Sequence, residues 1–493
     1  MSYYIGVDLG TSSMKLLLVD EGGNILRSVS RSYGVCYPKN GWSEQSPTDW
    51  WDALNSAVPE LISDVDGMQV AAIGVAGQMH GLVVLDDDDK VIRPTILWND
   101  SRTADEVEYL NTVIGKEKLT ELTANIAFAG FTAPKILWMY KNEPENFSKI
   151  RKIMLPKDYI NYKLTGQHAT DYSDASGMLL LDVKNRCWSK QMLDICHISE
   201  ELLPKLYESY EVIGTVSETV AAKLGISSDV KVIAGAGDNA AAAIGTGTFG
   251  NGKCNISLGT SGTVFITSDK FSVDDNSALH SFAHADGGYH LMGCMLSCAS
   301  CNKWFIEDIL CTEDYTREFA SIKDSMLGKN DVFFLPYLMG ERSPINDTDA
   351  RGMFIGLTAG TTRAEMLQAI IEGVSFAIRD NVEVARKLGI SISESCICGG
   401  GAKTEIFRKI LSNVLNIDLK IPNSEEGPAF GVAILSMVAN GEYSSIGECI
   451  DKLVSYGKRI CADEELAEAY SEKYKKYKAI YPAVKKLYKI IKE

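Results

Sequence analysis

Two short strings of small residues, "LGTSS" (Leu9–Ser13) and "LGTSG" (Leu258–Gly262), occur once in each half of the 493-residue chain. Each lies between two runs with the composition of short strands, so both are predicted to form hairpin tips. A tip of glycine, threonine and serine presents backbone N–H groups and hydroxyls at one point, which suits a phosphate group. Such turns also arise by chance. The matching strand–turn–strand setting of the two copies nevertheless favours a pair of phosphate sites.

Asp238 is a candidate reactive side chain outside these strings. It follows the apolar run "VKVIA" and the small residues "GAG", and it begins an alanine-rich stretch that predicts a helix. An aspartate in this place either caps the helix N-terminus or directs its carboxylate at a ligand. The small residues before it let a ligand approach the backbone, so the sequence favours the second role.

A third candidate site is the stretch "CGGGAKTEIFRKIL", which begins at Cys398. Three glycines stand there between an expected strand and an expected helix. Glycines before a helix N-terminus let a nucleotide lie against the backbone. The stretch is not a Walker A loop, since no Gly-Lys-Ser/Thr sequence occurs in the chain.

Cys294, Cys298 and Cys301 have a C-x3-C-x2-C spacing that iron–sulfur clusters of radical enzymes also use. The surrounding run "MLSCASCNKWFIEDIL" predicts a helix with these thiols on one face. Buried cysteines that pack as small apolar side chains are the commoner outcome, and the sequence favours it. An iron–sulfur enzyme remains the alternative.

Strand-like and helical patterns alternate along both halves, which predicts an α/β fold. Residues 48–63 and 362–389 carry apolar side chains at the 3.6-residue spacing of helices. No proline-rich or serine-rich linker occurs, so a compact domain junction is expected near Gly245–Gly250. The "GTGTFG" pattern there has a helix pattern before it and a strand pattern after it, the reverse of a dinucleotide-binding loop.

Bulk composition excludes several functional classes. A net charge of −16 disfavours binding to nucleic acid or to anionic membranes, which calls for a basic surface. No signal peptide pattern and no apolar window of membrane-spanning length are found. Twelve scattered cysteines suggest reduced thiols in a cytoplasmic protein. The expected C-terminal helix carries a stripe of three tyrosines, Tyr470, Tyr474 and Tyr477. The stripe packs either on the protein's own core or on a second subunit, so a homodimer remains an alternative.

Taken together, the motifs along nearly the whole chain resemble those of the FGGY family of carbohydrate kinases. The matching stretches are "YIGVDLGTSSMK", "GWSEQSPTDWW", "AGQMHG", "ILWNDSRT", "GFTAPKILW", "LPKDYI", "SDASGMLLLDV", "GAGDNAAAA", "SLGTSG", "FLPYLMGERSP" and "GGGAKTEIFRKIL". The resemblance implies two ribonuclease-H-like α/β domains of the actin-like ATPase type, with the active site in the cleft between them. Residues 1–246 would carry the sugar site, the first hairpin and the catalytic aspartate. Residues 247–493 would carry the second hairpin and the adenosine site.

Residue roles follow from the resemblance, motif by motif. Asp238 matches the general base, and Asp8 matches the carboxylate that positions Mg²⁺ and the transferring phosphate. Both aspartates would hold the metal through water. The residues expected to bind the sugar are Gln78, Met79, His80, Asp238 and Asn239. The residues expected to face phosphates are Gly10, Thr11, Ser12, Ser13, Gly259, Thr260, Ser261 and Gly262, and those expected to border the adenosine are Gly400, Gly401 and Ala402.

The activity implied by the resemblance is transfer of phosphate from ATP, with Mg²⁺, to a sugar. D-xylulose, converted to D-xylulose 5-phosphate, is the expected substrate. Glycerol is disfavoured because glycerol kinases carry Arg-Glu where this chain has Met79-His80. Gluconate and L-ribulose remain alternatives. A non-catalytic actin-like nucleotide switch would need neither "GQMHG" nor a base at Asp238, so both features count against it.

Overall fold

The computed structural model describes residues 2–274, 276–424 and 426–492. The chain forms two compact units. Unit 1 comprises Met1–Phe249, Ser281–His290 and Glu426–Val454, and unit 2 comprises Gly250–His280, Leu291–Glu425 and Ser455–Glu493. The sequence predicts two consecutive domains that change at residue 246. The structure differs for two segments of the second half, which pack with unit 1.

A seven-stranded mixed sheet forms the centre of unit 1, with the strand order β13-β14-β5-β1-β2-β3 and β15 beside β5. These strands are β1 (Tyr3–Leu9), β2 (Ser13–Asp20), β3 (Ile25–Ser32), β5 (Val70–Gly77), β13 (Val212–Thr215), β14 (Lys231–Ile233) and β15 (Ala236–Gly237). Strand β1 pairs antiparallel with β2 and parallel with β5. The two-residue to three-residue strands of unit 1 are β4 (Glu44–Gln45), β6 (Val83–Leu85), β7 (Thr95–Ile96), β8 (Lys152–Met154), β9 (Ala169–Asp171), β10 (Leu181–Asp182), β11 (Cys187–Trp188) and β12 (Lys205–Tyr207).

Helices cover both faces of this sheet. The helices of unit 1 are α1 (Pro47–Leu61), α2 (Ala104–Glu108), α3 (Lys116–Thr123), α4 (Thr132–Asn142), α5 (Pro144–Ser148), α6 (Pro156–Thr165), α7 (Tyr172–Ala175), α8 (Lys190–Ile195), α9 (Glu218–Leu224), α10 (Asp238–Gly245), α15 (Gly427–Asn440) and α16 (Ile446–Leu453). Ile5 and Val7 of β1 share a core with apolar residues of α1, while Gly6 between them contacts α15. Because alternate residues of a strand point to opposite faces, α1 and α15 lie on opposite sides.

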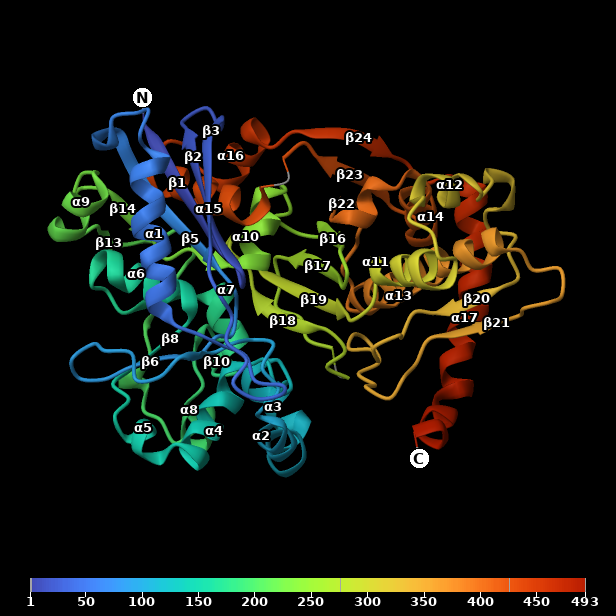
Figure 1. The fold of residues 1–493 in the computed structure, drawn as a ribbon, viewed down its shortest axis with the longest axis horizontal. Helices are drawn as coiled ribbons and strands as arrows, with labels where there is room; N and C mark the ends of the chain where they lie inside the picture. The colour runs from blue at the N-terminus through green and yellow to red at the C-terminus, as the bar shows by residue number, and fades with distance from the viewer. Residues whose placement is uncertain (1, 275, 425, 493) are drawn as a thin grey trace. The chain divides into compact units, whose positions relative to one another are not determined.

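Close backbone approach explains why α15 belongs to unit 1. A Cβ on Gly6 would lie 1.9 Å from the carbonyl oxygen of Ala429, and a Cβ on Gly431 would lie 1.9 Å from that of Ala241 in α10. Only glycine fits at such contacts. In Figure 1, α15 accordingly lies among the blue strands of the N-terminal sheet, although it is coloured by its late position in the chain.

Unit 2 repeats the arrangement. The second seven-stranded sheet has the order β18-β19-β17-β16-β22-β23-β24, in which β16 pairs antiparallel with β17 and parallel with β22. Most of β18 and the first two residues of β19 belong to the segment Ser281–His290, which is grouped with unit 1. The strands of the second half are β16 (Cys254–Leu258), β17 (Gly262–Ser268), β18 (His280–Ala283), β19 (Tyr289–Met295), β20 (Phe333–Leu335), β21 (Met353–Ile355), β22 (Glu394–Cys398), β23 (Asp418–Pro422) and β24 (Tyr456–Ile460). The helices are α11 (Ala299–Lys303), α12 (Tyr315–Ala320), α13 (Arg363–Lys387), α14 (Glu405–Leu415) and α17 (Glu464–Lys492).

The two hairpin tips and both long predicted helices, α1 and α13, are confirmed. A capping box at Thr362 and Glu365 starts α13. The tyrosine stripe of α17 is buried, and Tyr470, Tyr474 and Tyr477 all contact Phe376 of α13, so it packs on the protein's own core. Within the described residues, no helix combines the length and apolar character needed to cross a membrane.

The helix predicted around the three cysteines is wrong at its start. Cys294 lies in strand β19, and helix α11 begins only at Ala299. Pairing of β19 with its sheet neighbours overrides the local helical pattern. The Cys298 thiol lies close to Gly262, where an added Cβ would be 3.3 Å from the sulfur. Cys301 is buried in the same core. No cluster of three His, Cys, Asp or Glu side chains among the described residues is arranged to hold a metal. Cys298 and Cys301 are core side chains, whereas Cys294 is partly exposed.

Candidate active site

Three predicted functional segments meet at one edge of the unit 1 sheet. Leu9 of β1 pairs with Gly77 of β5, and Gly77 pairs with Gly237 of β15, all in parallel register. The first hairpin, the "QMHG" turn and Asp238 directly follow these three strand ends. The carboxyl edge of parallel strands is where open α/β sheets bind ligands.

Asp238 is the first residue of α10, and Gly237 takes the N-cap position. Its Oδ1 accepts hydrogen bonds from the backbone N of Asn239 at 2.7 Å and from Asn239 Nδ2 at 2.8 Å. Burial raises the pKa of Asp238 to about 6, against the lowering effect of these two bonds. The side chain stays partly exposed. The carboxylate is thus accessible and more basic than an ordinary aspartate, as a general base requires.

Asp8 lies one position before the end of β1, close enough for its charge to interact with that of Asp238. Burial and the Asp238 charge raise the pKa of Asp8 to about 7, while Lys15 opposes this shift. Lys15 in turn forms an ion pair with Glu426. Two neighbouring carboxylates, one of which raises the pKa of the other, are a donor set that suits Mg²⁺, which prefers a few carboxylates together with phosphate and water oxygens.

The two residues of the "MH" pair differ in their surroundings. Met79 is 6% exposed and lies against Gly237, whose Cβ would come within 3.1 Å of the Met79 side chain. His80 is partly exposed and has a φ of 71°, in the left-handed region. Its Nδ1 lies 2.8 Å from the Gly177 carbonyl oxygen, and its ring lies against that of Phe131, with the centroids 4.8 Å apart and the planes tilted by 34°. Since the carbonyl only accepts, Nδ1 carries the proton.

The side chain of Gln78 faces the protein rather than a ligand. It is 2% exposed, its Oε1 accepts from the Thr11 hydroxyl, and its Nε2 donates to Gln45, both at 3.0 Å. Both ends of the amide are therefore used inside unit 1. The contact with sugar that the sequence predicts for Gln78 stays a prediction.

In the first hairpin, the carbonyl oxygens are bound by the rest of unit 1. The Gly10 carbonyl accepts from the Tyr33 hydroxyl at 2.7 Å, the Thr11 carbonyl from Gln45 Nε2 at 2.6 Å, and the Ser12 carbonyl from the Tyr33 backbone N at 3.2 Å. In a trans peptide the N–H points away from the C=O. Because the carbonyl oxygens point toward these donors, the N–H groups of the same peptides point the opposite way, as a phosphate site requires.

The second hairpin is held in the same way by different donors. The Gly259 carbonyl accepts from the backbone N of Ala299, and the Thr260 carbonyl accepts from that of Cys298, both at 2.9 Å. The Ser300 hydroxyl adds a bond to Thr260 at 2.8 Å. The start of α11 thus fixes this hairpin, whose tip residues Thr260 and Ser261 are exposed.

The glycine-rich stretch lies beside the second hairpin. Ser257 of β16 pairs in parallel with Cys398 of β22, and a Cβ on Gly399 would lie 2.8 Å from the backbone of Leu258. A pocket of about 400 Å³ opens here in unit 2, within the size range of small-molecule sites. Its lining residues are Leu258, Gly259, Thr260, Ala299, Ser300, Asn302, Lys303, Tyr315, Phe319, Gly400, Gly401 and Thr404. Ala402 is buried outside this lining.

Several residues of these sites carry no local signal in the sequence. Tyr315 and Phe319 reach the pocket from α12, more than 50 residues after the hairpin. Gln45 and Tyr33 reach the first hairpin from neighbouring segments. The quoted motif "GWSEQSP" includes Gln45, but its pattern does not reveal which atom it binds.

Comparison with known proteins agrees with this arrangement. The N-terminal domain of the FGGY family of carbohydrate kinases matches residues 3–245, and the C-terminal domain matches residues 254–440. Xylulose kinase of Escherichia coli strain K12 is 38% identical over 480 residues, covering 97% of this chain and 98% of that protein.

Two solved structures extend the likeness to the fold. A xyloylose kinase from Brucella ovis has a TM-score of 0.93 at 37% identity, covering 98% of this chain and all of that chain. A gluconate kinase from Lactobacillus acidophilus has a TM-score of 0.93 at 29% identity, covering 98% of each chain. These matches confirm the expected two-domain α/β fold of the actin-like ATPase type. The chain belongs to the FGGY family of carbohydrate kinases.

Proposed function

We propose that this chain transfers the γ-phosphate of ATP to the terminal hydroxyl of D-xylulose, giving D-xylulose 5-phosphate. Membership of a carbohydrate kinase family makes ATP the phosphate donor and a sugar the acceptor. The observation that carries the proposal is the position of Asp8, His80 and Asp238 at three adjacent strand ends of one sheet. The xylulose kinases among its relatives favour a ketopentose as the acceptor.

Asp238 acts as the general base in this proposal. Its carboxylate accepts the proton of the sugar hydroxyl while that oxygen attacks the γ-phosphorus and the bond to the β-phosphate oxygen breaks. Help of this kind typically contributes a factor of about 10² to 10⁴ in rate. His80 and Asn239 orient the sugar, and Met79 packs beneath them.

Phosphate binding falls to the backbone N–H groups of the two hairpins. The adenosine moiety occupies the unit 2 pocket beside Gly400 and Gly401. Asp8, with Asp238, would hold Mg²⁺ through water, and the cation would neutralise charge on the phosphate oxygens. Lys15 and Glu426 set the local charge at Asp8.

A substrate panel tests the proposed acceptor. We expect the highest kcat/KM with D-xylulose when ATP consumption is measured across D-xylulose, L-ribulose, gluconate and glycerol. A site with fixed hydroxyl partners discriminates strongly against sugars that leave those partners unpaired. A clear preference for gluconate or L-ribulose would overturn the D-xylulose assignment and leave the kinase activity intact. No sugar-dependent ATP consumption would overturn the kinase proposal itself.

The pH dependence of kcat/KM for ATP tests the two carboxylates. Both must be ionised, so activity is full only well above pH 7 and is lost as the pH falls through about 7 and about 6, the raised pKa values of Asp8 and Asp238. Because the two groups interact, these steps belong to the pair. We expect log kcat/KM to fall with a limiting slope near two, and near one in Asp238→Asn. A flat profile from pH 7 to pH 5 would contradict the assignment.

A further inference from the structure

The proposed phosphate hairpin of unit 1 and the "QMHG" turn are joined by a closed ring of three hydrogen bonds. The Thr11 hydroxyl donates to Gln78 Oε1 at 3.0 Å, and Gln78 Nε2 donates to Gln45 Oε1 at 3.0 Å. Gln45 Nε2 then donates to the Thr11 carbonyl at 2.6 Å, which closes the ring. One side chain therefore connects the backbone of the hairpin to the residue that precedes Met79.

The amide of Gln45 uses its full hydrogen-bonding capacity in this arrangement. Gln45 is 3% exposed, and its amide also accepts from Trp50 Nε1 at 3.3 Å and donates to the Gly34 carbonyl at 3.2 Å. A buried amide with every polar atom bonded has one orientation, since any other leaves a polar group unsatisfied. Gln45 is therefore a rigid contact for the Thr11 carbonyl.

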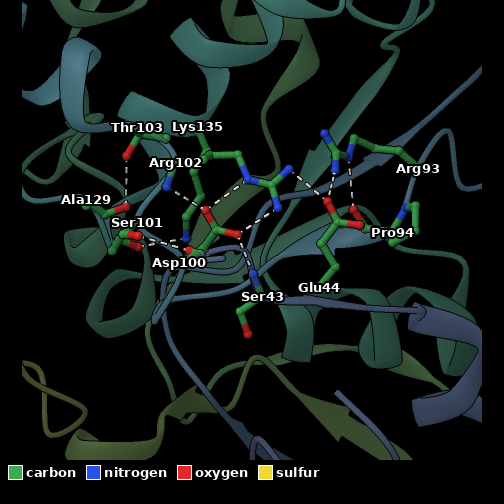
Figure 2. A network of polar contacts seen from close by, with 12 residues as sticks. Ser43, Glu44, Arg93, Pro94, Asp100, Ser101, Arg102, Thr103, Ala129 and Lys135 are labelled. Atoms are coloured by element: carbon green, nitrogen blue, oxygen red, sulfur yellow. Dashed lines mark hydrogen bonds and ion pairs between the residues drawn. The ribbon is translucent and has the colours of Figure 1, made fainter. Parts of the chain in front are cut away.

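A buried ion cluster holds the segment that carries Gln45 (Figure 2). Arg102 binds Asp100 through two nitrogens, at 2.9 and 2.7 Å, and also binds Glu44 at 2.7 Å. Asp100 accepts from the backbone N of Ser43 at 2.6 Å. Strand β4 consists of Glu44 and Gln45 and pairs with β7. The bonds to Ser43 and Glu44 hold this strand in place.

The same cluster fixes a second contact to the hairpin. Trp98 lies two residues before Asp100, and its Nε1 donates to the Thr11 hydroxyl at 3.0 Å. Thr11 is thus bound through its carbonyl by Gln45 and through its hydroxyl by Gln78 and Trp98. These contacts leave its hydroxyl no role in binding phosphate, and they determine the direction of the peptide between Thr11 and Ser12.

We propose that Gln45 is a positioning residue, which through the ring with Gln78 and Thr11 orients the Ser12 N–H toward the transferring phosphate and couples the hairpin to the sugar-binding turn. The proposal rests on the proposed function, because it takes the hairpin as the phosphate site. Loss of the Gln45 donor frees the Thr11 carbonyl, and the peptide can then rotate. A small displacement of this kind costs up to about 100-fold in rate, because transfer depends on alignment.

Gln45→Met removes the polar atoms and keeps the length of the side chain. We expect kcat to fall about 10-fold to 100-fold, while the affinity for D-xylulose alone, measured by calorimetry, changes by less than about threefold. Gln368→Met is the matched control. Gln368 is a buried glutamine of unit 2 that also donates two hydrogen bonds, at 3.0 and 2.8 Å. It should lose comparable thermal stability and little kcat.

A second pair of variants covers the case in which Gln45→Met does not fold. Thr11 is not buried, and Thr11→Val removes the hydroxyl that Thr11→Ser keeps. We expect a clearly larger loss of kcat for Thr11→Val than for Thr11→Ser. Where Gln45→Met folds, the Gln45→Met/Thr11→Val variant should be little worse than the poorer single variant, because residues that act as a unit are not additive. Equal kcat values for Thr11→Val and Thr11→Ser would overturn the proposal. Independent effects that multiply, or a kcat for Gln45→Met within threefold of wild type, would overturn the proposal. An inactive wild-type protein would instead overturn the proposed function.

Discussion

Asp238→Asn should lower kcat by about 100-fold or more, since it removes the proton acceptor and retains the shape of the side chain. The amide oxygen still accepts the bond from the Asn239 backbone N, and Gly237 rather than Asp238 occupies the N-cap position. Folding and sugar binding should therefore change little. Steady-state kinetics with D-xylulose, together with calorimetric binding of the sugar, measure these two expectations on one variant.

The alternative, that Asp238 mainly stabilises the start of α10, predicts the opposite pattern. Asp238→Asn would then turn over nearly normally, and Asp238→Ala would lose about 1 kcal/mol of stability, as other residues at helix starts do. Thermal melts of the two variants distinguish these cases. A kcat above about one tenth of the wild-type value in Asp238→Asn would falsify the role as base, since general-base contributions begin near 10².

Gly431→Ala should produce a large loss of stability in unit 1. The new Cβ would lie 1.9 Å from the carbonyl oxygen of Ala241 and 2.7 Å from the carbonyl carbon of that residue. Neither backbone group can move without separating α10 from α15. Overpacking of this kind costs about 3 kcal/mol, more than the roughly 1 kcal/mol that alanine gains over glycine in a helix.

Gly427→Ala provides a control on the same helix, one turn earlier. Its Cβ would meet the Ala242 side chain at 3.4 Å, an ordinary contact, so we expect little change or a small gain. Calorimetric melting of both variants tests the comparison. Equal melting temperatures for the two would show that α15 does not press on α10 as closely as the structure indicates.

Features that depend on local sequence were predictable. Gly10–Ser13 and Gly259–Gly262 are hairpin tips because small polar residues separate two short apolar runs, and α13 follows from its apolar spacing and its capping box. The stretch from Cys294 to Lys303 misled the prediction, because strand pairing decides its first residues.

Features that depend on contacts between distant segments were not predictable. Helix α15 has the same local pattern whichever sheet it covers, and contacts with distant segments, such as those with Gly6 and Ala241, place it in unit 1. Gln78 was expected to bind the sugar because its motif "GQMHG" resembles that of the family. Its partners Thr11 and Gln45 lie 67 and 33 residues away in sequence, so no local pattern reports them.

The return of Glu426–Val454 to unit 1 has a consequence for synthesis of the protein on the ribosome. When Phe249 has been added, the growing chain still lacks α15, and the glycine-bearing faces of β1 and α10 have nothing to cover them. Translation at about 5 to 20 residues per second supplies the missing roughly 200 residues only after some 10 to 40 seconds. During that interval the nascent N-terminal domain exposes apolar surface, which makes it a substrate for chaperones. The N-terminal domain therefore cannot finish folding before the C-terminal half has been synthesised.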